Sequence, residues 1–407
     1  MSSEKWIHKK LGEVCTIHGR IGFRGYTTDD LVEKGYGAIT FSPSDIHDSK
    51  LCYDNCDYIS WFKYEESPEI KVFNGDILFC KTASIGKCAI VENLKEKATI
   101  NPQFVVLKDF TCDSKYLYYK LISYDFQTHV LGITGGSTIK TMSQEKLGLE
   151  PISFPALPDG SPDIAAQRRI AAILSSADKV IASTQKVIAK YKQMKQGMME
   201  DLLKPKEGWK KVKLGEIGTF KNGINKDKSQ FGFGTMYVSI SDAYLEEINY
   251  KTLNRLNATD KEIEEYSLFT GDIVFVRSSV KPSGVGYTTL FGDYDKEPVL
   301  FSGFMIRYRL NDNINYCPSF MNYLLRDERF RLQVISKSTV SANTNINQES
   351  LKELSCSIPN ITEQRRIVAI LSGIDAKIAA EEKVLEKYGK VKKGMMERML
   401  EGCRIIN

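Results

Sequence analysis

Two long stretches of the chain, residues 161–204 and 361–407, place apolar side chains at a spacing near 3.5 residues. In the first stretch these positions form two lines, Ile170, Ala177, Tyr191 and Met198 beside Leu174, Ile181, Ile188 and Leu202. In the second stretch the two lines are Ile367, Ile374, Tyr388 and Met395 beside Leu371, Ile378, Leu385 and Met399. The lines are interrupted by Thr184, Lys195, Glu381 and Lys392. Such spacing over several heptads predicts long helices with a coiled-coil seam.

The alternative for each stretch is an amphipathic helix that lies on its own globule. About 40 helical residues reach roughly 60 Å, which is longer than a domain of this size can cover, so the coiled coil is favoured. The first helix is expected to begin with Ser161 as its N-cap, Pro162 at the first helical position and Asp163 in the first turn.

The rest of the chain alternates short apolar runs with turn signals. Runs such as Asp76–Cys80 and Phe104–Leu107 predict strands mixed with a few helices. The chain therefore divides into a first globule (1–160), a first long helix (161–204), a second globule (205–360) and a second long helix (361–407). The predicted fold class is α+β, with two mixed α/β globules separated by two long helices.

The two halves of the chain repeat each other. The phrase Gln-Arg-Arg-Ile-Ala-Ala-Ile-Leu at 167–174 returns, with one change, at 364–371, which is 197 residues later. A Trp-x4-Leu-Gly-Glu pattern opens each half, at 6–13 and 209–216, and Gly-Asp-Ile-Leu-Phe at 75–79 returns as Gly-Asp-Ile-Val-Phe. Solenoid repeats run from about 20 to 50 residues, so a period near 200 indicates a duplicated unit of one globule and one helix.

The short connection between the first helix and the second globule predicts the direction of helix pairing. Residues 204–208 form this connection, and five residues span at most about 18 Å. If the helices were parallel, the connection would have to recross the whole first helix. We therefore expect an antiparallel pair, with one globule near each end and a pseudo-two-fold axis between the halves.

Composition and charge narrow the class of protein. The 407 residues are 42% hydrophobic and carry a net charge of +5, below the strongly basic balance of a protein whose whole surface binds nucleic acid, so a DNA-binding face would be a local patch. The sequence starts without an apolar signal segment and has no run of about 18 apolar residues. We expect a cytoplasmic protein without membrane contact, whose nine cysteines are reduced thiols with no metal site.

The ordered motifs, present twice, resemble the specificity subunit of type I restriction–modification enzymes. The matching elements are the two Trp-x4-Leu-Gly-Glu openings, the two Gly-Asp strands, Gly136-Ser137-Thr138 with Lys337-Ser338-Thr339, Pro155 with Pro359, and the Gln-Arg-Arg-Ile helices that end in Gly-Met-Met. The resemblance covers essentially all of the chain. It implies a non-catalytic reader of double-stranded DNA with two target recognition domains. It also implies two modification subunits and restriction subunits as partners, which would carry S-adenosylmethionine, ATP and Mg²⁺, with no cofactor in this chain.

The loops of the two globules differ more than their framework does. The segment 19–26 contains two arginines among glycines, whereas the loosely corresponding segment 221–226 reads Lys-Asn-Gly-Ile-Asn-Lys. Two globules on a rigid spacer suit two half-sites on one face of a duplex. A shared framework with different loops therefore predicts a bipartite, non-palindromic target.

Cations, hydroxyls and amides in these loops are the candidate DNA contacts, because cations hold phosphates while amides and arginines suit base edges. In the first globule they are Arg20, Arg24, Tyr26, Lys81, Thr82, Ser84, Lys87, Asn101, Gln103, Ser137, Thr138 and Lys140. In the second globule they are Lys221, Asn222, Lys226, Arg277, Ser278, Lys281, Lys337, Ser338, Thr339 and Asn343. For each of them, ordinary turn structure or a solvated loop is the alternative.

Helix pairing and partner binding are assigned to the repeated helices. In the first helix the residues are Gln167, Arg168, Arg169, Ile170, Leu174, Ile181, Ile188, Tyr191 and Met198. In the second they are Gln364, Arg365, Arg366, Ile367, Leu371, Ile378, Leu385, Tyr388 and Met395. Gly197 and Gly394 lie inside helices, where a glycine costs about 1 kcal/mol. Their equivalent positions indicate close approach by a partner or by the opposite helix, and the alternative is a local break.

Two other classes of function are disfavoured. Asn101-Pro102-Gln103-Phe104 resembles the Asn-Pro-Pro-Phe/Tyr motif of amino-methyltransferases, but Gln103 replaces a proline and no Phe-x-Gly-x-Gly cofactor loop precedes it. The chain contains no Gly-x4-Gly-Lys-Ser/Thr motif, and its four histidines form no triad spacing, so a stand-alone methyltransferase or nuclease has no support. The other rival is a coiled-coil adaptor that does not read DNA.

Overall fold

The computed structural model describes residues 5–133, 141–244, 248, 250–312, 315–340 and 343–400. The chain forms two compact units, of which unit 1 contains residues 1–185 and 383–407 and unit 2 contains residues 186–382. Each unit therefore combines one globule with half of each long helix. This grouping differs from the four consecutive segments into which the sequence pattern divides the chain.

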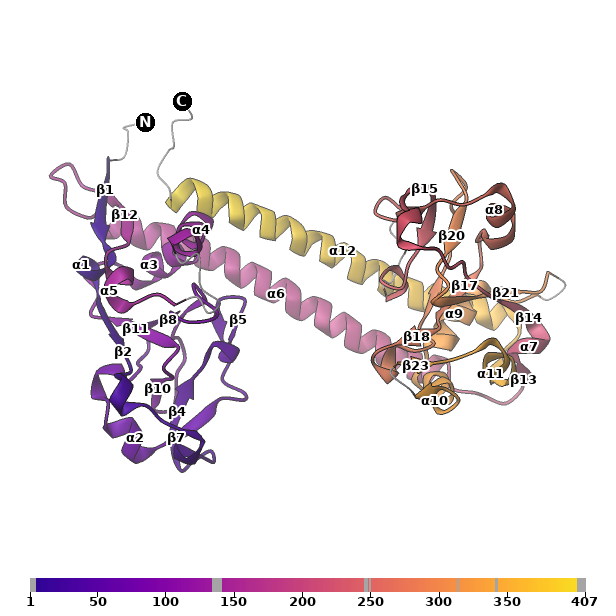
Figure 1. Cartoon of the computed structure of the whole chain (residues 1–407), viewed down its shortest axis with the longest axis horizontal. Coiled ribbons are helices and arrows are strands. Elements are labelled where there is room, and N and C mark those ends of the chain that lie inside the picture. Colours follow the sequence, from indigo (N-terminus) through magenta and orange to yellow (C-terminus); the bar gives the residue numbers. More distant parts are fainter. Residues whose placement is uncertain are drawn as a thin grey trace. The chain divides into compact units, whose positions relative to one another are not determined.

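Two four-stranded sheets form the globule of unit 1 (Figure 1). The first, in the order β2-β11-β8-β9, consists of β2 (Thr16–Gly19), β11 (Phe104–Lys108), β8 (Ile77–Cys80) and β9 (Cys88–Ile90). The second, in the order β10-β4-β7-β3, consists of β10 (Ala98–Ile100), β4 (Gly37–Phe41), β7 (Asp57–Ser60) and β3 (Leu31–Val32). Two strand pairs accompany them, β1 (Lys5–Lys10) with β12 (Pro151–Ala156) and β5 (Ile46–His47) with β6 (Lys50–Leu51).

The strand β8 lies between two hydrophobic cores, which explains why its sequence is an unbroken apolar run. Successive side chains of a strand face opposite sides, so Ile77 and Phe79 enter one core while Leu78 and Cys80 enter the other. The first core is covered by α1 (Leu11–Val14), α3 (Ser114–Leu121), α4 (Tyr124–Ile133), α5 (Gln144–Gly148) and parts of both long helices. The helix α2 (Trp61–Glu65) packs through Tyr64 on the second sheet.

Unit 2 is built on the same plan. Its main sheet, in the order β14-β21-β17-β19, consists of β14 (Gly218–Asn222), β21 (Met305–Leu310), β17 (Ile273–Val276) and β19 (Thr288–Leu290). Its other sheets are β16 (Asn254–Leu256), β15 (Phe231–Val238) and β20 (Val299–Phe301); β18 (Ser278–Ser279), β23 (Thr344–Asn345) and β22 (Thr339–Val340); and β13 (Lys210–Lys213) with β24 (Ser355–Ile358). Its helices are α7 (Leu214–Ile217), α8 (Asp260–Tyr266), α9 (Pro318–Arg326), α10 (Glu328–Ser336) and α11 (Gln348–Glu353). As in β8, the residues of β17 alternate between two cores.

The two long helices are α6 (Ile164–Leu202) and α12 (Ile361–Leu400). The start of α6 differs from the prediction, because the Ala166 N–H donates to Asp163 Oδ1 at 2.8 Å. Asp163 therefore caps the helix, while Ser161 and Pro162 lie before it. The aspartate lies two residues closer to the apolar run than Ser161, so its side chain can accept from a free N–H group of the first turn. Among the described residues, no helix is long and apolar enough to cross a membrane.

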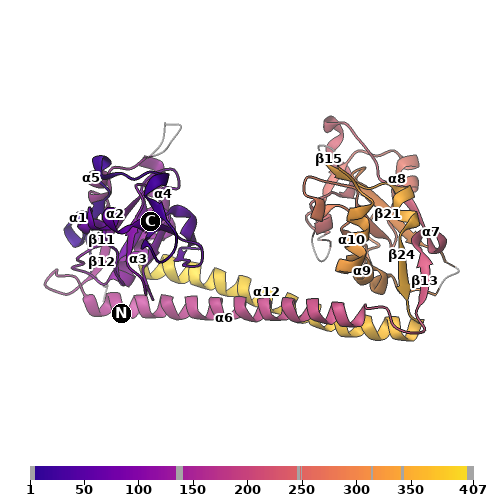
Figure 2. The same ribbon diagram turned by 90° about the horizontal axis from the view of Figure 1, so that it is seen from below.

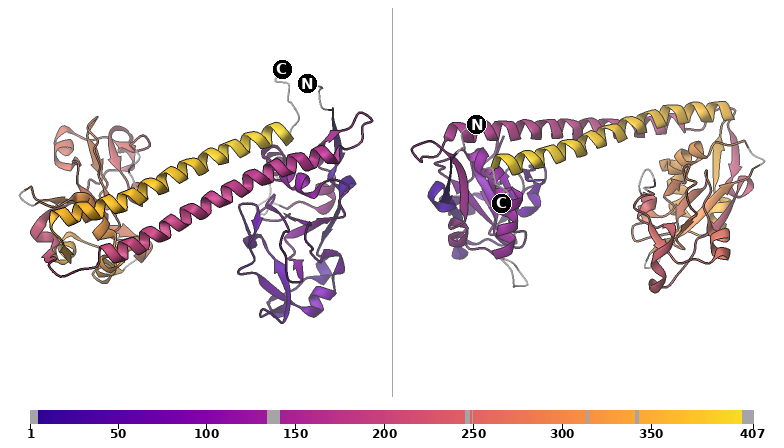
Figure 3. Two further views of the ribbon diagram at one scale, coloured as in Figure 1. Left: turned by 180° about the vertical axis from the view of Figure 1, so that it is seen from behind. Right: turned by 90° about the horizontal axis from the view of Figure 1, so that it is seen from above.

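In each unit the halves of α6 and α12 lie side by side and run antiparallel (Figure 2). In unit 2, Lys192 pairs with Glu382 at 2.7 Å, and Lys195, further along α6, pairs with Asp375, earlier in α12. In unit 1, the last residue of α12, Leu400, packs in the same core as the early α6 residues, and Figure 3 shows the same pairing from two further sides. The predicted antiparallel direction is confirmed.

The predicted seam is mostly buried, with Tyr388 as an exception. The fully or largely buried residues are Leu174, Ile188, Ile367, Leu371 and Ile378, and the half-buried ones are Ile170, Ile181, Tyr191, Met198, Leu385 and Met395. Tyr388 is 37% exposed, so it contributes little to the seam. The four arginines of the repeated phrases, Arg168, Arg169, Arg365 and Arg366, are also exposed. They are therefore not part of the pairing surface, and only a partner role remains open for them.

The lysines that interrupt the apolar lines take part in the pairing. In unit 1, Lys392 Nζ lies 2.6 Å from Asp178 Oδ1, and Tyr119 OH donates to Asp178 Oδ2 at 2.7 Å. Lys392 also lies 5.7 Å from the centre of the Tyr119 ring. The equivalent trio of unit 2 is Lys195, Asp375 and Tyr323. Each Tyr–Asp–Lys trio thus joins a globule to both helices of its own unit.

The glutamine that opens each repeated phrase fastens its helix to its globule. Gln167 and Gln364 are both fully buried. Gln167 Oε1 accepts from the backbone N–H of Asp113 at 3.0 Å, and Gln364 Oε1 accepts from that of Cys317 at 2.9 Å. Both donors lie directly before a helix, α3 or α9, so the repeated phrase makes the same main-chain contact twice.

Candidate nucleic-acid interface

An open groove of about 680 Å³ lies on unit 2 beside the loop that follows β17. Four segments line it: residues 240–244, which include the 3-10 turn η6 (Asp242–Tyr244), the loop 278–287, Phe304 directly before β21, and Asn343 directly before β23. Among the residues predicted to touch DNA, Ser278, Lys281 and Asn343 line this groove. We call it the unit-2 groove. The fold has brought together side chains that the sequence places in separate loops.

Hydrogen bonds hold the loop of the unit-2 groove in place. Tyr244 OH lies 3.4 Å from Ser279 Oγ and 3.4 Å from the Gly284 carbonyl oxygen, which ties η6 to the loop. An added Cβ at Gly284 would lie 2.2 Å from Ser279 Oγ, so a larger residue at this position would displace the serine hydroxyl. Behind the loop, Arg331 donates to the Ser283 carbonyl oxygen at 2.7 Å.

Two positively charged side chains lie close to one wall of the groove. Tyr287 contacts two guanidinium groups, with Arg326 Cζ at 4.6 Å and Arg331 Cζ at 5.8 Å from its ring centre. These are distances of cation–π contacts. Burial lowers the pKa of Arg331 from its ordinary value, yet an arginine keeps its charge in proteins. An aromatic wall above two cations suits a polyanionic ligand that also offers flat or apolar edges.

Unit 1 carries the same loop framework after β8. The Cys80 N–H donates to the Lys87 carbonyl oxygen at 2.8 Å, and the Val276 N–H donates to the Tyr287 carbonyl oxygen at the same distance. Since these bonds occupy the same place in the two sheets, Lys87 is the counterpart of Tyr287. Lys281, the other lysine predicted downstream of these strands, lies within the longer loop of unit 2.

A second pair of bonds fixes another equivalence. The Lys81 N–H donates to the Gln103 carbonyl oxygen at 2.8 Å, and the Arg277 N–H donates to the Phe304 carbonyl oxygen at 2.8 Å. Gln103 is thus the counterpart of Phe304. In unit 1, the Asn101 side chain donates to Gln103 Oε1 at 3.0 Å, which orients the glutamine amide. The residues 101–104, which resemble a methyltransferase motif, thus form a turn.

The sequence interpretation missed a serine-rich turn beside each loop. Ser42 N–H donates to Asp45 Oδ2 at 2.6 Å, and Ser239 N–H donates to Asp242 Oδ2 at 2.8 Å. In unit 1, Lys87 Nζ donates to the carbonyl oxygen of Pro43, which lies within this turn, at 2.6 Å. The turn and the loop 81–87 are therefore in contact. The available signal was Ser-x-Ser-Asp at 42–45 and again at 239–242, 197 residues apart. Tyr244 and Phe304 were also missed, because neither belongs to a repeated motif.

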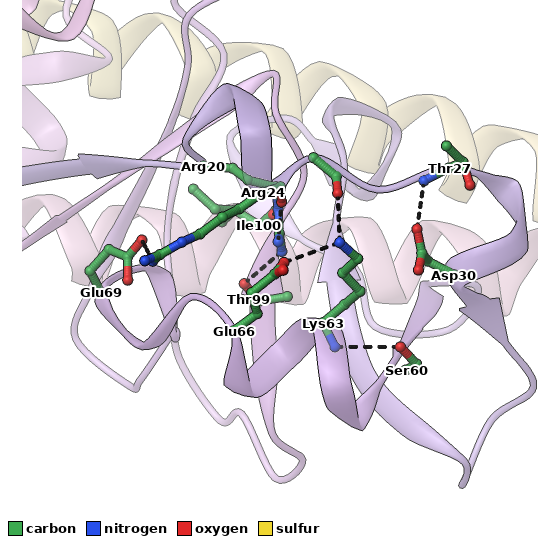
Figure 4. A network of polar contacts seen from close by, with 11 residues as sticks. Arg20, Arg24, Thr27, Asp30, Ser60, Lys63, Glu66, Glu69, Thr99 and Ile100 are labelled. Atoms are coloured by element: carbon green, nitrogen blue, oxygen red, sulfur yellow. Dashed lines mark hydrogen bonds and ion pairs between the residues drawn. The ribbon is translucent and has the colours of Figure 1, made fainter.

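Arg20 is buried, and Figure 4 shows its side chain among Thr99, Ile100 and Arg24. Its side chain is 5% exposed and donates to the Ile100 and Arg24 carbonyl oxygens, each at 3.3 Å. It also lies 5.2 Å from the centre of the Tyr26 ring, and burial lowers its pKa. Tyr26 accepts a hydrogen bond from Thr40 at 3.2 Å. The predicted DNA contact of Arg20 is therefore contradicted, since its guanidinium group stabilises the globule.

Other predicted cations are paired with acids inside their own globules. Arg24 lies 3.4 Å from Glu69 (Figure 4). In unit 2, α8 supplies the partners of two lysines, since Lys221 lies 2.9 Å from Glu265 and Lys226 lies 2.7 Å from Glu262. Asn222 lies in β14 and is half-buried. These pairs neutralise charges that the sequence suggested were available to phosphates.

The remaining predicted contacts fall into three groups. The residues that lie in or beside the unit-1 loop are Lys81, Thr82, Ser84, Lys87 and Gln103, and burial lowers the pKa of Lys81. Lys337 and Ser338 directly follow α10, where Ser338 donates to the Val334 carbonyl oxygen, while Thr339 pairs with β23 beside the unit-2 groove. Ser137, Thr138 and Lys140 lie outside the described residues.

Metal and thiol chemistry offers no alternative site in the described ranges. There, no three His, Cys, Asp or Glu side chains are grouped so as to hold a metal ion. The eight cysteines that the structure describes are free thiols. Burial raises the pKa of Cys15 and Cys356 to about 12, which keeps both protonated and unreactive at neutral pH.

Residues 3–193 and 206–387 each match the type I restriction modification DNA specificity domain. The chain belongs to this family. It is 25% identical over 334 residues to the type I restriction enzyme MjaVIII specificity subunit of Methanocaldococcus jannaschii, covering 76% of this chain and 75% of that protein. It is 23% identical over 435 residues to the putative MjaX specificity subunit of the same organism, covering 98% and 93%.

Solved structures of the family share the fold of this specificity subunit. The type I restriction–modification S subunit from M. genitalium has a TM-score of 0.57 at 14% identity and covers 98% of this chain and 97% of that one. A chain from a type I R-M system assembly gives a TM-score of 0.56 at 17% identity, covering 97% of both chains. The family and the fold class predicted from the motifs are thereby confirmed. The specificity subunit is the recognition part of such a system and not one of its catalytic parts.

The long helices of this specificity subunit also expose a second apolar stripe. On α6 it consists of every seventh residue, Ile173, Val180, Val187 and Met194. The equivalent positions of α12 are Ile370, Lys377, Val384 and Val391, of which the three apolar ones are exposed. A heptad spacing outside the seam is the pattern of a helix surface that receives a further helix.

Proposed function

We propose that this specificity subunit reads a bipartite, non-palindromic DNA target, with one half-site for each globule. The unit-1 loop 81–87 and the unit-2 groove are the reading surfaces. The paired helices set the gap between the half-sites. The chain itself holds no cofactor. S-adenosylmethionine, ATP and Mg²⁺ are supplied by the modification and restriction subunits.

The observation that carries this proposal is the contrast between equivalent positions. Two backbone hydrogen bonds that occur in both units make Lys87 equivalent to Tyr287 and Gln103 equivalent to Phe304. A charged and an amide side chain thus stand in unit 1 where two aromatic rings stand in unit 2. Because a shared backbone presents different chemistry, the two globules favour different bases, and the target is asymmetric.

Partner binding is assigned to the exposed stripes of α6 and α12. Two modification subunits would each lay an apolar helix along one stripe, with Val180 and Val384 among the contact residues. The exposed arginines of the repeated phrases, such as Arg168 and Arg365, would add polar contacts at the edge. The equivalent spacing of the two stripes supports two copies of one partner.

The test is co-expression with the modification subunit in a methylation-free host, followed by genome-wide mapping of N6-methyladenine. We expect a split motif of two different half-sites with a fixed gap. Gln103→Ala should relax one half of the motif and Phe304→Ala the other half. Methylation of a palindromic motif, or of one half only, would contradict the proposal.

A complex that purifies intact but neither binds nor methylates a specific sequence would favour the coiled-coil adaptor. In that case DNA binding would also lack the steep salt dependence of phosphate contacts. A variant that places a charge in a stripe, Val180→Glu, serves as the control for assembly. Because the α12 stripe stays intact, it should reduce the number of co-purified modification subunits from two to one while leaving the isolated specificity subunit folded.

A further inference from the structure

The unit-2 groove exposes more apolar surface than a solvated loop of a stable protein normally does. Val280 is 83% exposed, Phe304 58% and Tyr244 41%, and all three line the same groove. Single exposed apolar residues are ordinary, but a group of them in one hollow indicates a binding surface.

The apolar character of the groove is specific to unit 2. At the two positions that backbone bonds make equivalent, Phe304 and Tyr287 replace Gln103 and Lys87. The loop is also longer in unit 2, with eight residues between Arg277 and Gly286, whereas four residues lie between Lys81 and Gly86 in unit 1. Val280 belongs to this longer loop. The strand framework is shared, whereas the loop of unit 2 is longer and carries apolar side chains where unit 1 carries polar ones.

We infer that the unit-2 groove recognises the 5-methyl group of thymine in the major groove of its half-site. This inference rests on the proposed function. The thymine methyl is the apolar group that a base pair presents on its major-groove edge. Phe304 and Val280 supply the apolar contact, while Ser278 and Lys281 at the same groove bind the neighbouring phosphates.

The groove is held ready for such a contact. The loop is tied to η6 through Tyr244 and to α10 through Arg331, by the bonds to Ser279, Gly284 and Ser283. A methyl group offers no hydrogen bond to orient it, so discrimination depends on a surface that does not rearrange. The cations behind Tyr287 favour DNA over an apolar protein segment as the occupant.

The experiment uses the full chain assembled with its modification subunits. Selection from random duplexes first gives the target. Each thymine of each half-site is then replaced by deoxyuridine, which removes only the methyl group. We expect about fourfold weaker binding for each methyl that the groove contacts, at one or two thymines of a single half-site. Phe304→Ala should weaken binding to the thymine target and abolish the difference between thymine and deoxyuridine at those positions.

A matched control is Leu332→Ala, which truncates another exposed apolar residue of unit 2 that does not line the groove. It should leave the discrimination unchanged. If the complex selects a split target but deoxyuridine has no effect in either half, the inference is wrong and the proposed function stands. The inference is also wrong if Phe304→Ala disrupts subunit assembly and leaves DNA affinity unchanged. If no specific target is selected, the inference and the proposed function fail together.

Discussion

Lys226 and Lys281 carry the same charge in different surroundings. Lys226 lies 2.7 Å from Glu262, and its hydrogen bond is the main cause that lowers the pKa of that carboxyl group to about 2. Lys281 instead lies on the exposed rim of the unit-2 groove, directly before a 3-10 turn. Of the two, we therefore expect the second lysine to meet a phosphate.

Replacing each lysine by methionine separates these roles. Lys281→Met should weaken DNA binding for all sequences alike and reduce the slope of log affinity against log salt by about 1, the contribution of one phosphate contact. Lys226→Met, the control, should leave both quantities unchanged because its charge is already neutralised. Fluorescence titrations of the assembled complex at several salt concentrations measure both. Equal slopes for the two variants would contradict the assignment.

Arg20 shows why single contacts are hard to predict from sequence. Glycines on both sides of it are typical of a loop that approaches DNA. The guanidinium instead turns to Ile100 and Thr99, which are 80 and 79 residues away in the chain. A local pattern carries no information about partners at such a distance, so burial of this arginine follows only from the fold.

At the scale of elements, the two long helices were predictable because a heptad is a local pattern. Their direction followed from the length of one linker. The sequence did not explain why Lys195 and Lys392 interrupt the apolar lines. Their tyrosine partners belong to the globules and their aspartate partners to the opposite helix, so both contacts depend on the fold. Each lysine that interrupts the apolar seam is therefore part of a polar contact between a globule and both helices.

Removing one such contact should weaken unit 1. Lys392→Met leaves the mostly buried Asp178 with Tyr119 alone, and we expect a loss of about 2 kcal/mol in the free energy of unfolding, between the values for exposed and buried pairs. Urea unfolding followed by circular dichroism measures it. The control is Lys390→Met, which breaks an exposed pair with Glu386 and should cost less than about 0.5 kcal/mol. Equal losses would show that the trio adds nothing.

For the two helix glycines, Gly197 and Gly394, we predict that substitution raises the free energy of unfolding. An added Cβ at Gly197 or Gly394 would meet no atom within 4 Å, and both helices continue past these residues. The predicted close approach of the opposite helix is therefore wrong, as is the local break, and approach by a partner remains the proposal. Substitution by alanine should stabilise each helix by about 1 kcal/mol.

The same two alanine variants should weaken binding of the modification subunit, measured by co-purification and by titration. Gly389→Ala is the matched control, since it also lies in open space within α12 but has no glycine counterpart in α6. It should stabilise the helix and leave partner binding unchanged. Full binding by the Gly197→Ala and Gly394→Ala double variant would remove the proposed partner contact.

At the scale of the whole molecule, duplication was the strongest sequence signal, because repeats several residues long survive where single residues diverge. It identified β8 and β17, both buried on two faces, and the loops that follow them. The unit-2 groove was not predictable as a site, since Tyr244, Val280 and Phe304 come from three segments that only the folded sheets bring together.

Duplication also predicts modular specificity. Exchanging residues 1–160 for the first globule of another family member should change one half of the target and leave the other half and the gap intact. Methylation mapping of the chimaeric complex measures this. The reciprocal exchange of residues 205–360 is the control and should alter the opposite half. A change in both halves would contradict independent reading.

Such exchanges require a contact between globule and helix that a foreign globule can also make. The two buried glutamines supply one. Gln167 and Gln364 each accept a hydrogen bond from a backbone N–H of the globule, and Gln364 also donates to the Pro359 carbonyl oxygen. Main-chain donors and acceptors are the same whatever side chains surround them. A gene that recombines at the repeated phrase would thus join a foreign globule to a familiar helix with this main-chain contact intact, and new recognition sequences could arise in a single crossover.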